Sequence, residues 1–229
     1  MAPVSPSGEA TVAIETSTRS ASVALKYGTE VRSATLTASR AHASDLLPEL
    51  DRLCSELGTT PAAIQSVFVG TGPGSYTGLR VGIATALGLV RGTGAVLLGV
   101  PSGETVAYAE LAPGAECAFL LDARQAQVYY ARYRRGADDV EVLQPPCVMS
   151  TSEIGAKLED DVTIFGDATV ADAASLSAAQ RARLVTDVIP SAARLIDLGR
   201  EQLARRGPDA PESVEPLYLR PFAAKARKR

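Results

Sequence analysis

Histidine and cysteine are scarce in this 229-residue sequence. His42 is the only histidine, and the three cysteines, Cys54, Cys117 and Cys147, lack the C-x-x-C spacing of zinc sites. These residues therefore cannot build a metal cluster. An odd number of widely spaced cysteines is typical of reduced, buried thiols rather than of a disulfide framework, which favours a reducing compartment.

Long apolar runs and a strong net charge are also lacking. No apolar stretch approaches the roughly 18 residues that a membrane span needs, and the amino end has no basic segment followed by an apolar one. The net charge is −3, so the overall balance does not indicate a nucleic-acid or anionic-membrane partner, although 225–229 is locally basic. We expect a cytoplasmic globular protein in which this tail is a frayed solubility tail rather than an RNA hook.

Short runs of β-branched and apolar residues, separated by small polar turns, predict strands in the first half of the chain. They span 11–16, 22–27, 31–38, 66–69 and 95–100. Two helices are predicted between them. The first begins near His42 and carries one stripe of leucines at positions 46, 50, 53 and 57. The second begins after Ser75, the expected N-cap, and ends near Arg91.

The second half repeats this order loosely. It offers strands over 117–122, 127–134 and 162–169, and a final amphipathic helix over 191–206 with Leu195, Leu198 and Leu203 inward. A carboxylate ends the first strand of each half, Glu15 in one and Asp122 in the other. We therefore predict two related α/β halves: an amino-terminal lobe over 1–101, and a second lobe over 102–229 that includes the final helix and the tail.

A glycine-rich stretch, GTGPGSYTGLRVG, joins the strand over 66–69 to the second helix. A P-loop needs a lysine after its last glycine, but none occurs between Lys26 and Lys157. A dinucleotide fingerprint fails because Thr77 replaces its third glycine and because no acid occurs from 57 through 103. Pro73 and Thr77 also replace the two glycines of a serine-nucleophile turn. The stretch therefore lacks the chemistry of a phosphate cradle or a hydrolase.

Small residues form one face of the second helix, where Gly78, Gly82 and Ala86 follow each other at intervals of four. Each glycine inside a helix costs about 1 kcal/mol relative to alanine, so Gly78, Gly82 and Gly88 require a compensating contact. Two partners fit this face: the leucine-striped helix of the same chain, or another protein.

Seven segments together carry a family resemblance. In chain order they are AIETSTRSASVAL, HASDLLPEL, GTGPGSYTGLRVGIATALGL, LLGVPSGETVA, LLDARQAQVYYARY, IFGDA and EPLYLR. They resemble the TsaB (YeaZ) family over nearly the whole chain, and the central glycine stretch is highly specific to it. The resemblance implies an α/β fold of the two-lobed actin-like ATPase type, with two related ribonuclease H-like halves.

The same resemblance implies a cytoplasmic role in making threonylcarbamoyladenosine next to the anticodon of tRNA. In that pathway a threonylcarbamoyl-adenylate donates its acyl group, the homologous subunit TsaD performs the transfer, and TsaE supplies ATPase function. A TsaB-type chain would be the non-catalytic scaffold that pairs with TsaD. It would meet tRNA mainly through the complex, bind no nucleotide of its own while ATP or ADP sits at the complex interface, and form homodimers when isolated.

The resemblance also suggests which residues to examine. The expected partner interface contains His42, Leu46, Leu50, Leu53, Leu57, Gly78, Arg80, Gly82, Ile83 and Ala86. Nucleotide or loop contacts are expected at Glu15, Thr16, Ser17, Gly72, Gly74, Ser75, Asp122 and Arg124. Glu15 stands where most members have aspartate. Leu46 stands where the catalytic partner has the second histidine of its H-x-x-x-H metal pair, so neither a metal nor a catalytic residue is expected in this chain.

Two other classes of function remain open. A nucleotide-dependent ATPase or phosphotransferase of the actin-like fold would use Glu15, the turn over 16–18, the loop over 72–75, and Asp122 for magnesium or as base. The missing acids around the glycine loop count against it. A metallopeptidase is weaker still, because the sequence has no metal pair.

Overall fold

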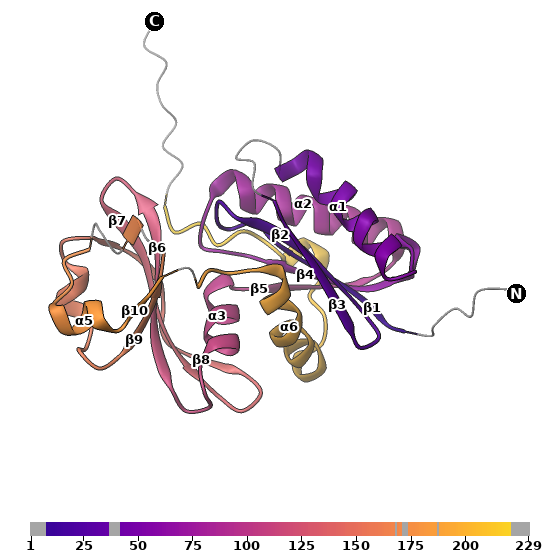
Figure 1. Ribbon diagram of the computed structural model, residues 1–229. Coiled ribbons are helices and arrows are strands. Elements are labelled where there is room, and N and C mark those ends of the chain that lie inside the picture. Colours follow the sequence, from indigo (N-terminus) through magenta and orange to yellow (C-terminus); the bar gives the residue numbers. More distant parts are fainter. Residues whose placement is uncertain (1–7, 37–41, 168, 171–173, 187, 221–229) are drawn as a thin grey trace, which may run out of the picture.

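The computed structural model describes residues 8–36, 42–167, 169–170, 174–186 and 188–220, without the side chains of 42–44. These residues form two lobes that lie side by side, each built around a five-stranded sheet (Figure 1). The duplicated α/β arrangement predicted from the sequence is therefore present.

The first sheet holds the strands of the amino-terminal half. They are β1 (Ala10–Glu15), β2 (Ala21–Tyr27), β3 (Glu30–Leu36), β4 (Ile64–Gly70) and β5 (Val96–Val100), in the order β3-β2-β1-β4-β5. β2 runs antiparallel to its neighbours β1 and β3, whereas β1, β4 and β5 run parallel. Because the parallel strands end at one edge of the sheet, the turns that follow β1 and β4 meet there.

Helices cover both faces of this sheet. α1 (His42–Glu56) and α2 (Tyr76–Thr93) pack on the face that carries Val12 and Ile14. On the opposite face, α6 (Ala192–Arg206) packs against Ala13 and Phe68. Alternate residues of β1 thus face different helices, as the period of two in a strand requires.

The second sheet repeats the first. Its strands are β6 (Glu116–Arg124), β7 (Gln127–Arg135), β8 (Val140–Ser150), β9 (Thr163–Gly166) and β10 (Leu184–Val185), in the order β10-β9-β6-β7-β8. β7 is antiparallel to β6 and β8, while β9 and β10 are parallel to β6. Strand directions and order therefore match those of the first sheet, with β6 in the place of β1.

Short helices complete the chain. They are α3 (Ser102–Glu110), α5 (Ala178–Ala182), and the 3-10 helices Pro61–Ala63, Ile154–Lys157 and Pro211–Ser213. α3 packs on the second sheet through Val106 and Ala107, which lie in one cluster with Phe119 and Tyr133. The sequence reading missed α3 and β8.

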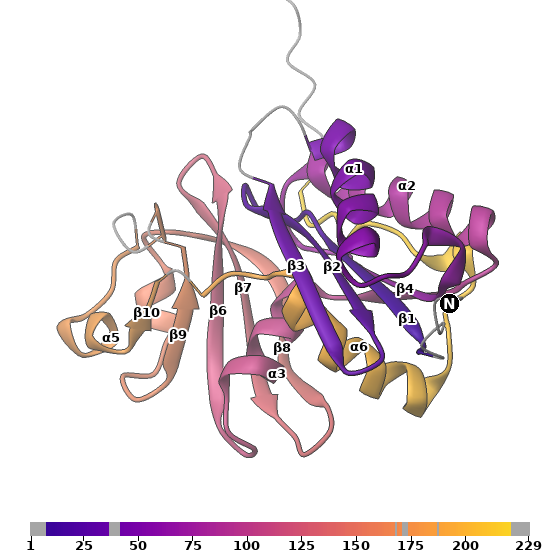
Figure 2. The same cartoon turned by 45° about the vertical axis from the view of Figure 1, so that its right-hand side comes forward.

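The expected lobe boundary needs a correction. Although α6 follows the second sheet in sequence, it packs on the first, and at Gly199 an added Cβ would lie 2.5 Å from the ring of Phe68. Figure 2 shows α6 below the first sheet and beside α3. The lobe over 102–229 is therefore wrong in its last part, because the inward leucines of α6 complete the amino-terminal core.

A partly buried carboxyl group lies where α3 meets α6. Glu104 Oε2 accepts a hydrogen bond of 3.1 Å from Nε2 of Gln202. Burial raises the pKa of Glu104 to about 7, and the hydrogen bond from Gln202 and the charges of Arg206 and Arg205 oppose that shift. Ionising Glu104 therefore costs folding free energy.

Most predicted elements agree with the structure to within a few residues. Ser75 caps α2 by accepting a hydrogen bond from the amide of Gly78, and Gly94 ends the helix with a left-handed backbone at φ 75°. Of the strand predicted over 31–38, the structure has β3 to Leu36; the last two positions lie outside the described residues.

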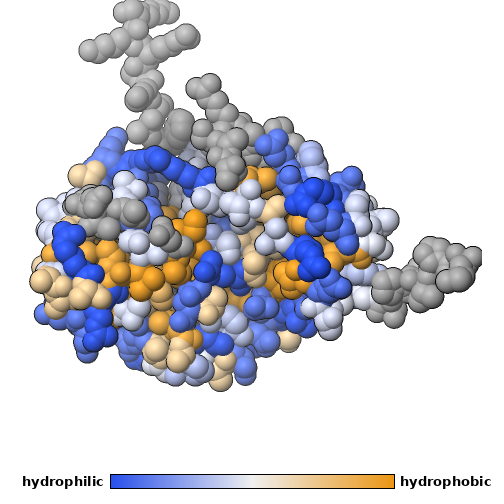
Figure 3. All heavy atoms as spheres, in the orientation of Figure 1, coloured by the Kyte–Doolittle hydropathy of each residue, from blue (hydrophilic) through white to orange (hydrophobic). Residues whose placement is uncertain are grey.

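The hydropathy of the surface and the burial of the cysteines are those of an ordinary globular protein. On the face in Figure 3, hydrophobic atoms form several patches among hydrophilic ones. Within the described ranges, no helix has both the length and the apolar character needed to cross a bilayer. Cys54 and Cys117 are buried free thiols, as expected, whereas Cys147 is half-buried.

Candidate functional site: a cleft between the lobes

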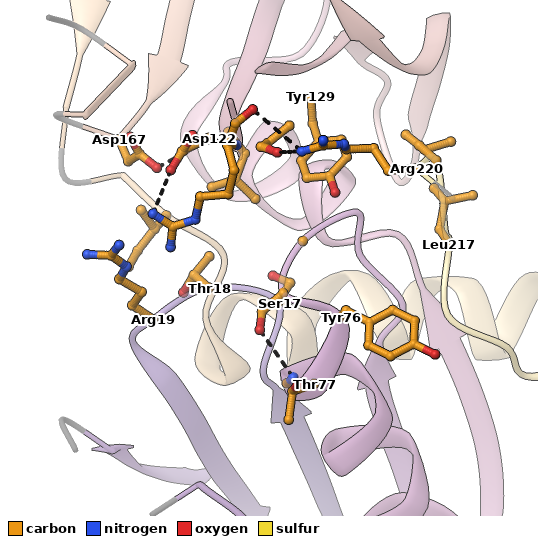
Figure 4. A pocket seen from close by; sticks show the side chains of 18 of the residues that line it. Ser17, Thr18, Arg19, Tyr76, Thr77, Asp122, Tyr129, Asp167, Leu217 and Arg220 are labelled. Carbon is orange, nitrogen blue, oxygen red and sulfur yellow. Dashed lines mark hydrogen bonds and ion pairs between the residues drawn. The ribbon is translucent and has the colours of Figure 1, made fainter. Parts of the chain in front are cut away.

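A cleft of about 1360 Å³ opens between the two lobes (Figure 4). The first lobe lines it with the β1–β2 turn, Ser17–Ser20, and with the start of α2, Gly74–Gly78. The second lobe contributes the end of β6 around Asp122, together with Asp167 after β9. Residues 217–220 of the carboxyl-terminal segment form the remaining wall.

The glycine-rich loop forms because another backbone approaches it closely. The amide of Ser75 donates a 2.7 Å hydrogen bond to the carbonyl of Ser17. A Cβ at Gly74 would lie 2.2 Å from that carbonyl oxygen, and one at Gly78 would lie 2.2 Å from the carbonyl oxygen of Thr16. Only glycine leaves room for the β1–β2 turn to pack here.

The small face of α2 therefore packs inside the chain. At Gly82 an added Cβ would meet the hydroxyl of Thr16 at 2.2 Å, and Ile83 and Ala86 lie in the core of the first lobe. Burial is nearly complete for the α1 stripe too: Leu46, Leu50 and Leu53 are at most 2% exposed. A partner therefore cannot reach Gly82, Ala86 or the three leucines in the folded chain.

The expected partner interface is accordingly wrong for Leu46, Leu50, Leu53, Gly78, Gly82 and Ala86. Arg80 is exposed and Leu57 is half-buried, and Ile83, although only 5% exposed, lines a shallow groove on α2, so these three remain accessible. The side chain of His42, the first residue of α1, lies outside the described part of the structure.

Glu15 points into the protein rather than into the cleft. Its side chain is fully buried, and Oε1 accepts a 2.7 Å hydrogen bond from the amide of Ser17. Burial raises its pKa, and hydrogen bonds, chiefly from Ser17, oppose that shift. Thr16 is equally buried, and Gly72 is held by Ser102, whose Oγ accepts from the Gly72 amide at 3.1 Å.

Three of the expected loop contacts, Glu15, Thr16 and Gly72, thus do not line the cleft. The residues on this side do not fit the magnesium-bound nucleotide that the actin-like fold implies, because the carboxyl group that should face the metal is turned into the core.

Asp122 and Asp167 supply the acidic side of the cleft. Asp122 forms an ion pair of 3.1 Å with Arg124 and accepts a 2.8 Å hydrogen bond from the Arg124 amide. Asp167 accepts a 3.4 Å hydrogen bond from the Asp122 amide and a 2.9 Å one from that of Val170. Both carboxylates are therefore engaged in shaping the second lobe.

Of the expected loop contacts, Ser17, Gly74, Ser75, Asp122 and Arg124 do line this one cleft. Sequence reasoning missed Asp167, Arg19 and Arg220. The signal for Asp167 was available, because it follows a strand that echoes β4 and so ends at the same edge as β6. The position of Arg220 depends on a contact across 96 residues and has no local signal.

The hairpin turn beside Arg124 has an unusual backbone. Arg124, Gln125 and Ala126 all have positive φ, at 66°, 55° and 55°. Such a backbone costs a residue other than glycine roughly 1–2 kcal/mol, so neighbouring contacts must hold the turn. Thr151 supplies one, since its amide donates a 3.0 Å hydrogen bond to the carbonyl of Ala126.

Neither a histidine nor a cysteine lines the cleft, and the described residues contain no group of three or more metal-ligating side chains. The cleft thus combines bound carboxylates, hydroxyl groups and arginines. This arrangement can position a polar ligand or a partner segment.

Comparison with known proteins shows which family the chain resembles. The model of the TsaD family, tRNA N6-adenosine threonylcarbamoyltransferase, matches residues 35–194. A protein of Escherichia coli K12 named tRNA threonylcarbamoyladenosine biosynthesis protein TsaB is 28% identical over 221 residues, covering 91% of this chain and 94% of that one. The chain belongs to the TsaB (YeaZ) family.

Two further matches agree. TsaB of Haemophilus influenzae is 27% identical, with 91% of this chain and 92% of that protein covered. The solved structure of YeaZ from Pseudomonas aeruginosa superposes on this TsaB-family chain with a TM-score of 0.79 at 25% identity, over 92% of this chain and all of that one. Together with the two matching sheets, these findings confirm the two-lobed actin-like fold.

Proposed function

We propose that the chain takes part in making threonylcarbamoyladenosine in tRNA, in the cytoplasm, as a non-catalytic scaffold that pairs with a TsaD-like catalytic subunit. Its relatives are named for this pathway. The observation that carries the non-catalytic role is the single histidine of the sequence: the second position of an H-x-x-x-H pair is Leu46, which is buried in the core. One imidazole cannot hold the partner's metal.

The buried position of Glu15 bears on where a nucleotide could bind. Since this carboxyl group is buried and faces the core, the chain alone does not present it to a magnesium ion. We propose that any ATP or ADP of the complex, and the TsaE-like ATPase, act where the subunits meet, and that tRNA is held mainly by the complex.

The docking surface must consist of side chains that the fold leaves exposed. Leu47 is 51% exposed on α1, and on α2 Arg80, Ala84 and the half-buried Leu87 line a shallow groove of about 420 Å³ beside Pro216. We propose that the TsaD-like subunit packs on these outward faces, and that the isolated chain uses the same surface to form a homodimer. Apolar side chains at the base of a groove with a charged rim are typical of such interfaces.

Reconstitution tests the function. Threonylcarbamoyl transfer to tRNA is measured with the TsaD-like and TsaE-like subunits, with and without this chain, and with this chain alone. We expect transfer only when all are present. Transfer by the other subunits alone would contradict the scaffold role, and transfer or ATP hydrolysis by this chain alone would contradict the non-catalytic one.

The docking surface has a separate test. Ala84→Arg places a long charged side chain on the exposed face of α2, and Ala156→Arg does the same on the second lobe. We expect only Ala84→Arg to abolish co-purification with the TsaD-like subunit, while both variants keep the wild-type circular dichroism. Normal pairing of Ala84→Arg would show that the surface is wrong even if the scaffold role holds.

A further inference from the structure

The carboxyl-terminal segment, residues 209–220, is attached along the first lobe. The amide of Gly99 donates a 2.9 Å hydrogen bond to Oδ2 of Asp209, and Asp209 also bridges to Leu97 on the edge strand β5. Val214 packs over Gly99, where an added Cβ would approach it to 3.1 Å. The segment therefore follows the edge of the first sheet toward the cleft.

Its next residues remain on the first lobe. The amide of Leu217 donates a 2.8 Å hydrogen bond to the carbonyl of Thr71, in the glycine-rich loop. The ring of Tyr218 stacks on Tyr76, the first residue of α2, with a centroid distance of 4.7 Å. Both rings are partly exposed, at 44% and 36%, and they border the groove on α2.

The following two residues are on the second lobe. Leu219 packs against the apolar cluster that holds Phe119 and Tyr129. Arg220 donates hydrogen bonds to the carbonyl of Ala123 and, at 2.6 Å, to Oε1 of Gln125. Figure 4 shows Arg220 reaching across the cleft wall toward the β6–β7 turn.

Neighbouring residues of this segment thus hold opposite lobes. Successive Cα atoms are about 3.8 Å apart, so the step from Tyr218 to Leu219 leaves almost no slack. The cleft cannot widen at this point unless one of the two attachments breaks. Arg220 also holds the turn whose three left-handed residues are otherwise unfavourable.

We propose that residues 217–220 form a tether that fixes the aperture of the inter-lobe cleft and couples it to the exposed face of α2. Arg220 is a positioning residue for the strained turn, and Tyr218 is the point at which events on α2 reach the cleft. A molecule that displaces Tyr218 from Tyr76 therefore loosens the cleft. The inference concerns the chain alone and holds whatever partner binds α2.

Double electron–electron resonance measures the distance between the lobes when nitroxide labels are attached at Ala62→Cys and Ala156→Cys. Both positions are exposed, one on each lobe. Cys147→Ser removes the half-buried thiol, and Cys54 and Cys117 are buried. We expect one narrow distance distribution in the parent, and a broader one with a longer mean in Arg220→Ala and Tyr218→Ala. Arg183→Ala, an exposed arginine on the second lobe, is the matched control and should leave the distribution unchanged.

Hydrogen exchange gives a second measurement. The amide of Thr151, bonded to Ala126, should exchange about tenfold faster in Arg220→Ala, the change expected from losing a charge-assisted hydrogen bond. Ala126→Gly removes a strained left-handed residue and should reduce this effect. If Arg220→Ala fails to fold, Tyr218→Ala, at a partly exposed residue, decides alone. Unchanged distances in folded Tyr218→Ala and Arg220→Ala would overturn the tether.

Discussion

Alanine substitutions at two glycines of α2 should change stability in opposite directions. Gly88→Ala replaces a glycine whose Cβ position has no atom within 4 Å. The substitution should gain most of the difference in helix propensity, up to about 1 kcal/mol. Gly78→Ala gains no more than this, and its Cβ would sit 2.2 Å from the carbonyl oxygen of Thr16.

The cost at Gly78 follows from the geometry. Ordinary contact with a carbonyl oxygen requires about 1 Å more than this separation. The obstacle is a backbone atom and the added Cβ is fixed to the helix, so the β1–β2 turn must move away from α2. Overpacking of this kind costs about 1–3 kcal/mol, which exceeds the propensity gain. Gly82→Ala should fall between the two, because its obstacle is the rotatable hydroxyl of Thr16.

Urea denaturation followed by circular dichroism measures all three variants. We expect the urea midpoint to rise for Gly88→Ala and to fall for Gly78→Ala. The free energies of unfolding of the two variants should differ by about 1–3 kcal/mol. Equal shifts in the same direction would refute the assignment of close backbone packing at Gly78.

Three further predictions concern buried and capping groups. The folded pKa of Glu104, about 7 against an ordinary 4.5, means that stability from this group is greatest below pH 4.5 and is lost as pH rises through 7. Glu104→Gln should remove this dependence of stability on pH. Its free energy of unfolding should exceed that of the wild type by at most roughly 3 kcal/mol at pH 8 and by nearly nothing at pH 4.5. Parallel curves of unfolding free energy against pH for the two proteins would contradict this. Tyr133→Phe removes a buried hydroxyl without a partner among the described residues, so its melting temperature should rise, corresponding to about 1 kcal/mol. Ser75→Ala removes the cap of α2 and should lower the unfolding free energy in urea by about 1 kcal/mol.

Local patterns predicted much of this fold. The alternation of apolar residues located β1, β2, β6 and β7, and the two carboxylates at the ends of β1 and β6 revealed the repeat. These signals succeed because each rests on neighbouring residues along the chain. The glycines of the loop were also interpreted correctly as a requirement of geometry, since close backbone approach is what they permit.

Local patterns could not predict which residues pack against a given helix face. A small-residue face at Gly78 and Gly82 shows that something packs closely, but the occupant, Thr16, comes from a turn some 60 residues earlier. Glu15 likewise ends its strand where a ligand contact is expected, yet its side chain turns inward to the Ser17 amide. The direction of one side chain and the identity of a distant neighbour are set by tertiary packing.

The return of α6 to the first sheet has a consequence for biosynthesis. Phe68 and Leu98 are buried in the cluster that α6 completes, although α6 begins about 90 residues after β5 ends. As the chain leaves the ribosome, one apolar face of the first sheet therefore stays uncovered until the second sheet and α6 have been synthesised. The first lobe depends on the full chain, so a fragment that stops after β5 would expose this face and tend to aggregate.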